Sequence, residues 1–433
     1  MEDFVVLFLI PLLALMLPLF GLKPIHERTA LLFFLALYLV FIVWVPATDR
    51  WMGIQSFFGY TLSWNPALDR LICGIYGLAI ASFWAGYFFF IRLPISGKFP
   101  QTNLRKKNMT GVLYGIQILI WGLVLWNVIS SGMSVSGILN PGNQNEKDIL
   151  FSAEWRYPWI DLLSNVLPVC LFLQYYLKPR FSPVWIFFFA IWLGFSLLGG
   201  WRYRIILFCL FFVLHFLTNR KWNLRIWIPA AFLLTVSMAW LTLNRMAIAK
   251  RQFHLITFDM RQFDFAAFNM EFSNSRTFRA SLEHMEKMQA GHPGISAWTD
   301  VISNKFQDRS SFPNGKRPKP WILDATKSWI PPGWPWNPNP AVSQLEEFFL
   351  TFGWLGMALG MFLIGCWVRL LDSNRTNLLW NAFRIVGTAL LFQWVSRGFF
   401  LFQFQITLVC LIPFAVLMVL GSYLPDDSTP DKA

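Results

Sequence analysis

The chain has few charged residues for its length. Asp, Glu, Lys and Arg make up 14% of its 433 residues, whereas a soluble domain carries about 25%. So small a charged fraction cannot cover a water-facing surface of this size, which excludes a soluble globular enzyme and a disordered chain. Hydrophobic residues make up 56% of the sequence, and the apolar runs are continuous rather than alternating. The composition therefore indicates a helical membrane protein rather than a transmembrane barrel.

Cysteines and familiar catalytic motifs are also scarce. The five cysteines have no CxxC spacing and each lies in or beside an apolar run, so we interpret them as small buried hydrophobic residues. The sequence contains no GxxxxGK[ST] loop, no HExxH zinc motif, no GxSxG elbow and no Asp-x-Asp. We therefore expect no cofactor and no metal, and a transfer reaction would take its energy from an activated substrate.

Eleven apolar runs approach or reach the length that crosses a bilayer, which is about 20 residues. These runs are 4–22, 29–46, 70–91, 110–130, 159–177, 183–199, 204–218, 226–243, 345–368, 378–396 and 398–421. The sixth and seventh are short, and the last two are separated only by a tight turn. The sequence therefore predicts an all-α polytopic membrane protein with about 11 transmembrane helices.

Positive charge predicts the orientation of these helices. The formal net charge is +13, which in a soluble protein would suggest a nucleic-acid partner, but cytoplasmic loops of membrane proteins also accumulate Lys and Arg. With the N-terminus outside, the short inside segments hold 16 Lys and Arg and the short outside segments hold 7. We therefore predict a periplasmic N-terminus and a cytoplasmic C-terminus, a lipid bilayer around the helices and no nucleic-acid partner.

One long polar stretch, 244–344, separates the eighth and ninth runs. Hydrophobic residues three and four apart between Phe278 and Met288 predict a helix in its first half, whereas Pro- and Gly-rich segments predict loops in its second half. We expect a mainly helical loop domain on the outer face. The predicted division is transmembrane helices 1–8 in 1–243, the loop domain in 244–344, helices 9–11 in 345–421 and a cytoplasmic tail in 422–433.

Arginines lie at the outer ends of the predicted helices. Arg202 and Arg204 open the seventh helix after Gly199-Gly200-Trp201, where free backbone N–H groups and the positive dipole end face outward. Arg397 lies in the tight turn between the last two helices. Guanidinium groups bind diphosphates by bidentate hydrogen bonds, so these residues predict a pocket for a lipid-linked pyrophosphate. Anchoring at the lipid headgroups and hydrogen bonding between helices are the alternatives.

Two further features could contribute to chemistry. Glu347 follows Glu346 at the start of the ninth helix, where the dipole favours acidic residues, but a carboxylate there could also take a proton from a sugar hydroxyl. The loop stretch carries Arg, Lys and Trp side chains, for which a headgroup-facing surface is the alternative. The candidate substrate-binding residues are Arg204, Arg245, Arg251, Arg276 and Trp334. His254, His284 and His292 are interpreted as surface histidines.

Three stretches resemble the O-antigen polymerases, the Wzy-type oligosaccharide repeat-unit polymerases. They are Gly199-Gly200-Trp201-Arg202, the run from Glu347 to Gly356, and Ser396-Arg397-Gly398. Within the second, Phe349 and Thr351 stand where the family usually has Tyr and Asn. The stretches cover only some tens of residues, but they follow the family order and lie on one predicted side of the membrane.

The resemblance implies an inner membrane glycosyltransferase that transfers a growing glycan from undecaprenyl pyrophosphate to a lipid-linked repeat unit. Arg202 and Arg397, with Arg204, would stabilise the departing diphosphate, and Glu347 would be the base. The implied partners are an undecaprenyl-pyrophosphate-linked oligosaccharide, a chain-length regulator and a flippase. An O-antigen ligase is an alternative, although no His is followed by Asn here as is usual in ligases. A flippase or transporter would place charged residues deep in several helices.

Overall fold

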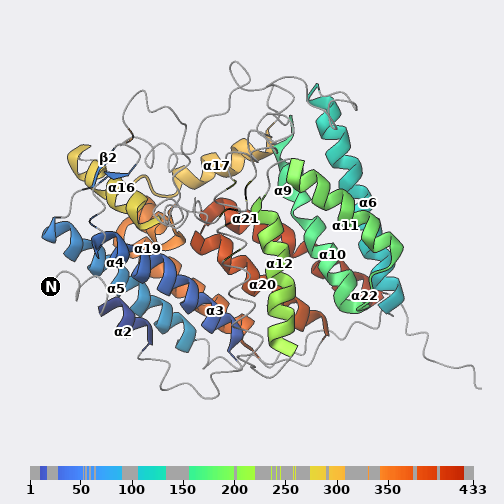
Figure 1. Ribbon diagram of the computed structural model, residues 1–433, viewed down its shortest axis with the longest axis horizontal. Coiled ribbons are helices and arrows are strands. Elements are labelled where there is room, and N and C mark those ends of the chain that lie inside the picture. The colour runs from blue at the N-terminus through green and yellow to red at the C-terminus, as the bar shows by residue number, and fades with distance from the viewer. Residues whose placement is uncertain are drawn as a thin grey trace, which may run out of the picture.

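The computed structural model is helical over nearly all the residues it describes (Figure 1). Those residues are 10–16, 28–51, 53, 56–57, 60–62, 65–89, 106–132, 156–198, 202–219, 236, 240, 244, 257, 259, 274–288, 292–307, 330, 342–373, 378–396 and 400–423. Within them the strands are β1 (Ser56–Phe57) and β2 (Tyr60–Thr61), an antiparallel pair in which Phe57 lies opposite Tyr60.

The helices follow the apolar runs. They are α2 (Ile10–Met16), α3 (Thr29–Tyr38), the π-helical η4 (Leu39–Trp44), α4 (Val45–Trp51), α5 (Pro66–Phe89), α6 (Lys106–Ser130), α9 (Pro158–Ser164), α10 (Val166–Leu177), α11 (Pro183–Leu198), α12 (Arg202–Asn219), α16 (Asn274–Met288), α17 (Ser296–Phe306), α19 (Gln344–Leu371), α20 (Leu378–Ser396), α21 (Phe400–Cys410) and α22 (Ile412–Tyr423).

Among the described residues, seven helical segments are long and apolar enough to cross a membrane. They are Thr29–Trp51, Pro66–Phe89, Asn108–Ser130, Pro158–Leu177, Gln344–Leu371, Leu378–Ser396 and Phe400–Leu420, with shorter apolar helices at Pro183–Leu197 and Tyr203–Thr218. These nine segments coincide with nine of the predicted runs, and the two shorter helices are the two runs predicted to be short. The all-α membrane fold is thus confirmed. The first and eighth runs lie mostly outside the described residues, so the total of eleven stays a prediction.

Helices α5 and α19 pack side by side through small residues. A Cβ atom on Gly86 would lie 1.9 Å from the carbonyl oxygen of Phe362, and one on Gly365 would lie 2.1 Å from the carbonyl oxygen of Phe83. Helix backbones approach this closely only where side chains are absent. Helices α5 and α19 therefore form a closely packed pair. The site described below lies at the N-terminal end of α19.

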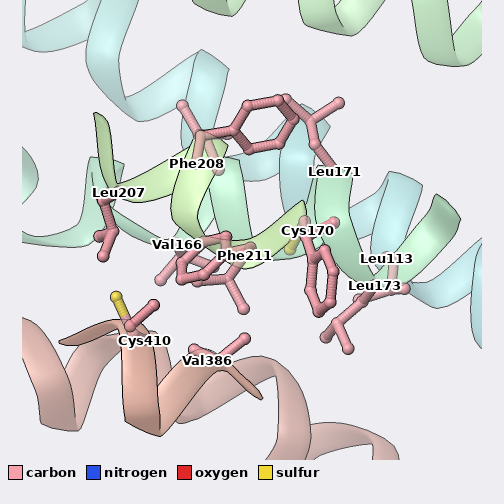
Figure 2. Close-up of a cluster of buried hydrophobic side chains, with 14 of the residues drawn as sticks. Leu113, Val166, Cys170, Leu171, Leu173, Leu207, Phe208, Phe211, Val386 and Cys410 are labelled. Carbon is pink, nitrogen blue, oxygen red and sulfur yellow. The ribbon is translucent and has the colours of Figure 1, made fainter. Parts of the chain in front are cut away.

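A second group of helices packs around α10, and Figure 2 shows its centre. Cys170 of α10 and Cys410 of α21 are buried there with Phe211 of α12 and Val386 of α20. All five cysteines are free thiols, as expected for residues without a disulfide role. Their predicted burial is only partly correct, because Cys209 is exposed on an apolar helix whose outer face would contact lipid.

Within the predicted loop domain, 244–344, the described residues lie mainly in α16 and α17. The predicted helix between Phe278 and Met288 is confirmed as part of α16. Figure 1 shows α16 and α17 in yellow at the end of the bundle where α5, α9, α19 and α21 begin. Helix α16 contacts η4, α4 and α5, and α17 contacts α9 and α21. We call this end the loop-domain end.

A buried carboxylate joins helices at the opposite end of the bundle. Asp372, which follows α19, accepts hydrogen bonds from the backbone N–H groups of Ala30 (2.9 Å) and Leu31 (3.1 Å) at the start of α3. It also accepts one from the hydroxyl of Tyr87 on α5 (3.1 Å). Burial raises the pKa of Asp372 to about 6, against these hydrogen bonds, which lower it. One acidic side chain thus ties three helices together by capping a helix other than its own.

Candidate functional site

Helix α19 begins with two buried carboxylates. Glu346 accepts hydrogen bonds from the backbone N–H of Ser343 (2.6 Å) and from the hydroxyl of Tyr76 on α5 (2.9 Å). Glu347 instead accepts a hydrogen bond from the backbone N–H of Phe400, the first residue of α21. Both side chains are at most 1% exposed. Glu346 therefore caps its own helix, whereas Glu347 caps α21, where the positive dipole end favours a carboxylate.

The contact of Glu347 joins the start of α19 to the start of α21. Phe400 is 53 residues from Glu347 in the sequence and three residues after Arg397. Residues 397–399 lie outside the described residues, but the ends that flank them, Ser396 of α20 and Phe400 of α21, are described. Glu347 is therefore hydrogen-bonded to the segment that resumes directly after the predicted catalytic turn.

Helix α19 is kinked one and a half turns after Glu347. Gly353 has φ +69° and ψ −157°, which are not helical values. The backbone N–H of Gly294 donates to the carbonyl of Thr351 (2.9 Å), and Nδ1 of His292 lies 2.9 Å from the carbonyl oxygen of Leu350. A carbonyl only accepts, so Nδ1 carries the proton. His292 is exposed, as predicted, and in addition it fastens the loop domain to the kink.

Aromatic rings enclose this junction. Trp298 of α17 contacts Phe352 edge to face at 5.0 Å between ring centroids, and Phe348 and Phe400 at 6.1 Å each. Phe348 and Phe400 also contact each other at 4.7 Å. Such ring pairs add specific geometry to burial. The loop domain, the kinked α19 and the start of α21 are therefore held in one arrangement around Glu347. We call this arrangement the α19–α21 junction.

Replacement of Gly353 by alanine is expected to destabilise this junction. A side chain rarely adopts φ +69°, and a Cβ atom there would lie 3.1 Å from the ring of His292. A backbone conformation of this kind costs about 1–3 kcal/mol in a residue other than glycine. We expect a lower thermal midpoint for the purified variant in detergent. Gly77→Ala on α5 is the matched control, because nothing lies within 4 Å of its Cβ position. Equal midpoints would contradict the prediction.

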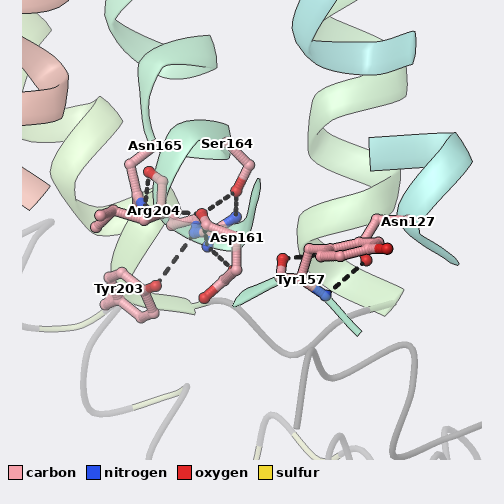
Figure 3. Close-up of polar contacts among 8 residues, drawn as sticks. Asn127, Tyr157, Asp161, Ser164, Asn165, Tyr203 and Arg204 are labelled. Atoms are coloured by element: carbon pink, nitrogen blue, oxygen red, sulfur yellow. Dashed lines mark hydrogen bonds and ion pairs between the residues drawn. The ribbon is translucent and has the colours of Figure 1, made fainter. Parts of the chain in front are cut away.

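Arg204 forms a buried pair on the other group of helices. Its guanidinium donates to Oδ1 of Asp161 (2.5 Å) and to Oγ of Ser164 (2.6 Å) on α9 (Figure 3). The Arg204 side chain is 1% exposed. Its charge is thus already neutralised by a carboxylate, and a diphosphate could bind it only by competing with Asp161. Arg202 is the first residue of α12, but its side chain lies outside the described residues.

Two more buried pairs anchor α16 to the membrane helices. Arg276 makes a bidentate pair with Asp49 of α4, with donor–acceptor distances of 2.6 and 2.5 Å. Arg279 pairs with Asp69 of α5. All four side chains are at most 6% exposed. The sequence analysis did not identify Asp49, Asp69 or Asp161, although an acidic residue near the end of an apolar run is a functional candidate in a membrane helix.

The candidate residues are thus only partly brought together. Glu347 contacts Phe400, three residues after Arg397, whereas Arg204 and Arg276 pair with carboxylates on different helices. Arg245, Arg251, Trp334 and Arg397 lie outside the described residues. Near the turn, Gln393 is fully buried, and its amide has no hydrogen-bond partner within the described part.

No cluster of three or more His, Cys, Asp or Glu side chains that could hold a metal occurs among the described residues. Comparison with known proteins adds no relative, because no family model, no curated protein and no solved structure matches this chain. The case for a function therefore rests on the residues and their geometry.

Proposed function

We propose that this protein is a polysaccharide polymerase, a glycosyltransferase that moves a growing glycan from undecaprenyl pyrophosphate to a lipid-linked repeat unit. The observation that carries the proposal is the hydrogen bond between Glu347 and Phe400. It links Glu347, in one stretch that resembles the polymerase family, to the helix that begins two residues after another such stretch, Ser396-Arg397-Gly398. The contact lies at the loop-domain end of a bundle of membrane-spanning helices. In the proposed orientation this end faces the periplasm, the N-terminus is periplasmic and the C-terminus is cytoplasmic.

In the proposed reaction the bond between the anomeric carbon of the donor glycan and its phosphate oxygen breaks, and undecaprenyl pyrophosphate departs with the bonding electrons. A new bond forms from the anomeric carbon to a hydroxyl oxygen of the acceptor sugar, and the hydroxyl proton is transferred to an oxygen of the departing diphosphate. Arg397 and Arg202 stabilise the negative charge that develops on the departing diphosphate. A junction enclosed by aromatic rings limits the access of water, which would otherwise hydrolyse the donor.

The geometry supports a positioning role for Glu347 in this reaction. Its carboxylate is 1% exposed and accepts a backbone N–H, so its most direct effect is on the start of α21 and on the turn before it. Arg204 and Arg276, with their buried carboxylate partners, support the shape of the loop-domain end rather than the leaving group. A flippase that delivers the repeat unit and a chain-length regulator are the proposed protein partners.

A strain that lacks this protein tests the proposal. We expect a glycan gel of the deletion strain to lose long chains and to retain acceptors that carry one repeat unit, and we expect the restored gene to return the long chains. Complete loss of repeat units from the acceptor would identify a ligase instead. Unchanged chain lengths would contradict both transferase assignments.

A further inference from the structure

A small cavity with a mixed apolar and polar lining lies between α16, α4 and α5. Its polar lining consists of Asp49, Tyr76, Ser275, Arg276 and Arg279, next to Cys73. Its volume is about 20 Å³, which is room for roughly one water molecule. The hydroxyl of Tyr76 in its wall donates to Glu346, which directly precedes Glu347. The cavity is therefore connected to the proposed transfer site by one hydrogen bond.

The charged groups in the cavity wall are paired. Arg276 pairs with Asp49, which also lines the cavity, and Arg279 pairs with Asp69, which lies outside the lining. Burying an ion pair costs desolvation energy that the attraction between its two charges often does not repay. Charged side chains near the interior of a membrane protein are therefore candidates for a functional role. Because the set is neutral overall, it does not favour a diphosphate. It suits hydroxyl groups, since carboxylates accept from them and guanidinium groups donate to them.

One buried polar atom of the cavity lining has no partner in the described part of the chain. It is Oγ of Ser275, in a residue that is 8% exposed. Buried polar atoms are normally hydrogen-bonded to protein or ordered water. A ligand that both donates and accepts hydrogen bonds would satisfy this hydroxyl, and a sugar hydroxyl does so.

We propose that this cavity is a carbohydrate subsite, which takes one hydroxyl of a sugar in the lipid-linked repeat unit while the sugar ring lies at its mouth. The size of the cavity fits this reading, because a single hydroxyl replaces a single water. The subsite would hold the glycan next to Glu346 and Glu347, and so next to the turn of Arg397. This inference rests on the proposed function, but it assigns a role to Asp49, Ser275 and Arg279 that the transfer chemistry does not require.

Filling the cavity tests the subsite through kinetics. Ser275→Leu occupies the space, and Ser275→Ala removes only the hydroxyl. We expect the leucine variant to raise the KM for the lipid-linked repeat unit by about tenfold or more, with a smaller change in kcat. The alanine variant should raise the KM by about two- to tenfold, the value of one lost hydrogen bond. A folded leucine variant with an unchanged KM would overturn the subsite.

Labelling of Cys73 tests the subsite without catalysis and without a substitution. The probe is the repeat-unit oligosaccharide released from its lipid diphosphate, added to wild-type protein before methyl methanethiosulfonate, with mass spectrometry of the labelled peptides. We expect slower labelling of Cys73 and unchanged labelling of Cys366, which is also half-buried but lies on α19 away from the cavity lining. Equal labelling with and without oligosaccharide, or protection by inorganic pyrophosphate alone, would overturn the subsite. If the oligosaccharide protects Cys73 but the protein does not lengthen glycans, the subsite stands and the proposed function is contradicted.

Discussion

Arg397→Ala and Arg202→Ala are each expected to abolish glycan lengthening while the protein still accumulates in the membrane. Arg397 lies between the ends of α20 and α21, and Arg202 is the first residue of α12, which packs against α20. Loss of one group that stabilises developing negative charge slows a reaction by about 100- to 1000-fold. A deletion strain that expresses each variant should therefore show single repeat units and no long chains on a glycan gel, with normal protein on an immunoblot of the membranes.

Substitutions of two other arginines distinguish a loss of charge stabilisation in the reaction from a loss of folded protein. Arg70 lies at the same end of the bundle, is exposed and bonds only the carbonyl of Pro66 among the contacts described for it (3.2 Å), so Arg70→Ala should leave lengthening intact. Arg204→Ala should instead reduce the amount of folded protein, because it leaves Asp161 buried without its partner, which costs about 3–5 kcal/mol. Normal long chains with Arg397→Ala would contradict the role assigned to Arg397.

The membrane helices could be predicted from the sequence because the core of a bilayer contains no water that could hydrogen-bond with the backbone. A spanning segment must satisfy its own N–H and C=O groups, so a continuous apolar run of sufficient length becomes a helix. The nine described helical segments therefore coincide with predicted runs, down to the two short ones at Pro183–Leu197 and Tyr203–Thr218. The helix in the loop domain was predictable for a related reason, since hydrophobic residues at helical spacing indicate a buried face.

The geometry of the site could not be predicted, because it depends on contacts between distant residues. Arg276 and Asp49 are 227 residues apart, and nothing in the local sequence of either selects the other. The sequence offered Glu347 as a base, or as an acidic residue that favours the dipole of its own helix. Glu346 instead caps that helix, and Glu347 accepts a hydrogen bond from the first residue of α21. The kink at Gly353 was also hidden, because a glycine in an apolar run is as compatible with a straight helix as with a broken one.

Substitution of Glu347 tests whether its contact with the start of α21 is needed for glycan lengthening. In Glu347→Ala the N–H of Phe400 at the start of α21 loses its acceptor, and an unsatisfied buried donor costs about 1–3 kcal/mol. The start of α21, three residues after Arg397, would then lose this contact with α19. We expect this variant to lose lengthening nearly as completely as Arg397→Ala, again by glycan gel. The control Glu346→Gln, on the adjacent residue, should affect lengthening much less, because its amide oxygen can still accept from Ser343.

Glu347→Gln distinguishes the two possible roles of the carboxylate. The amide oxygen of glutamine can still accept from Phe400, but an amide cannot take a proton from a sugar hydroxyl. If Glu347 positions the turn, the glutamine variant keeps most of the lengthening activity that the alanine variant loses, and its kcat changes little. A glutamine variant as inactive as the alanine variant, with normal accumulation and an unchanged thermal midpoint, would contradict the positioning role. Glu347 would then act as the base, and proton transfer would occur beside the start of α21.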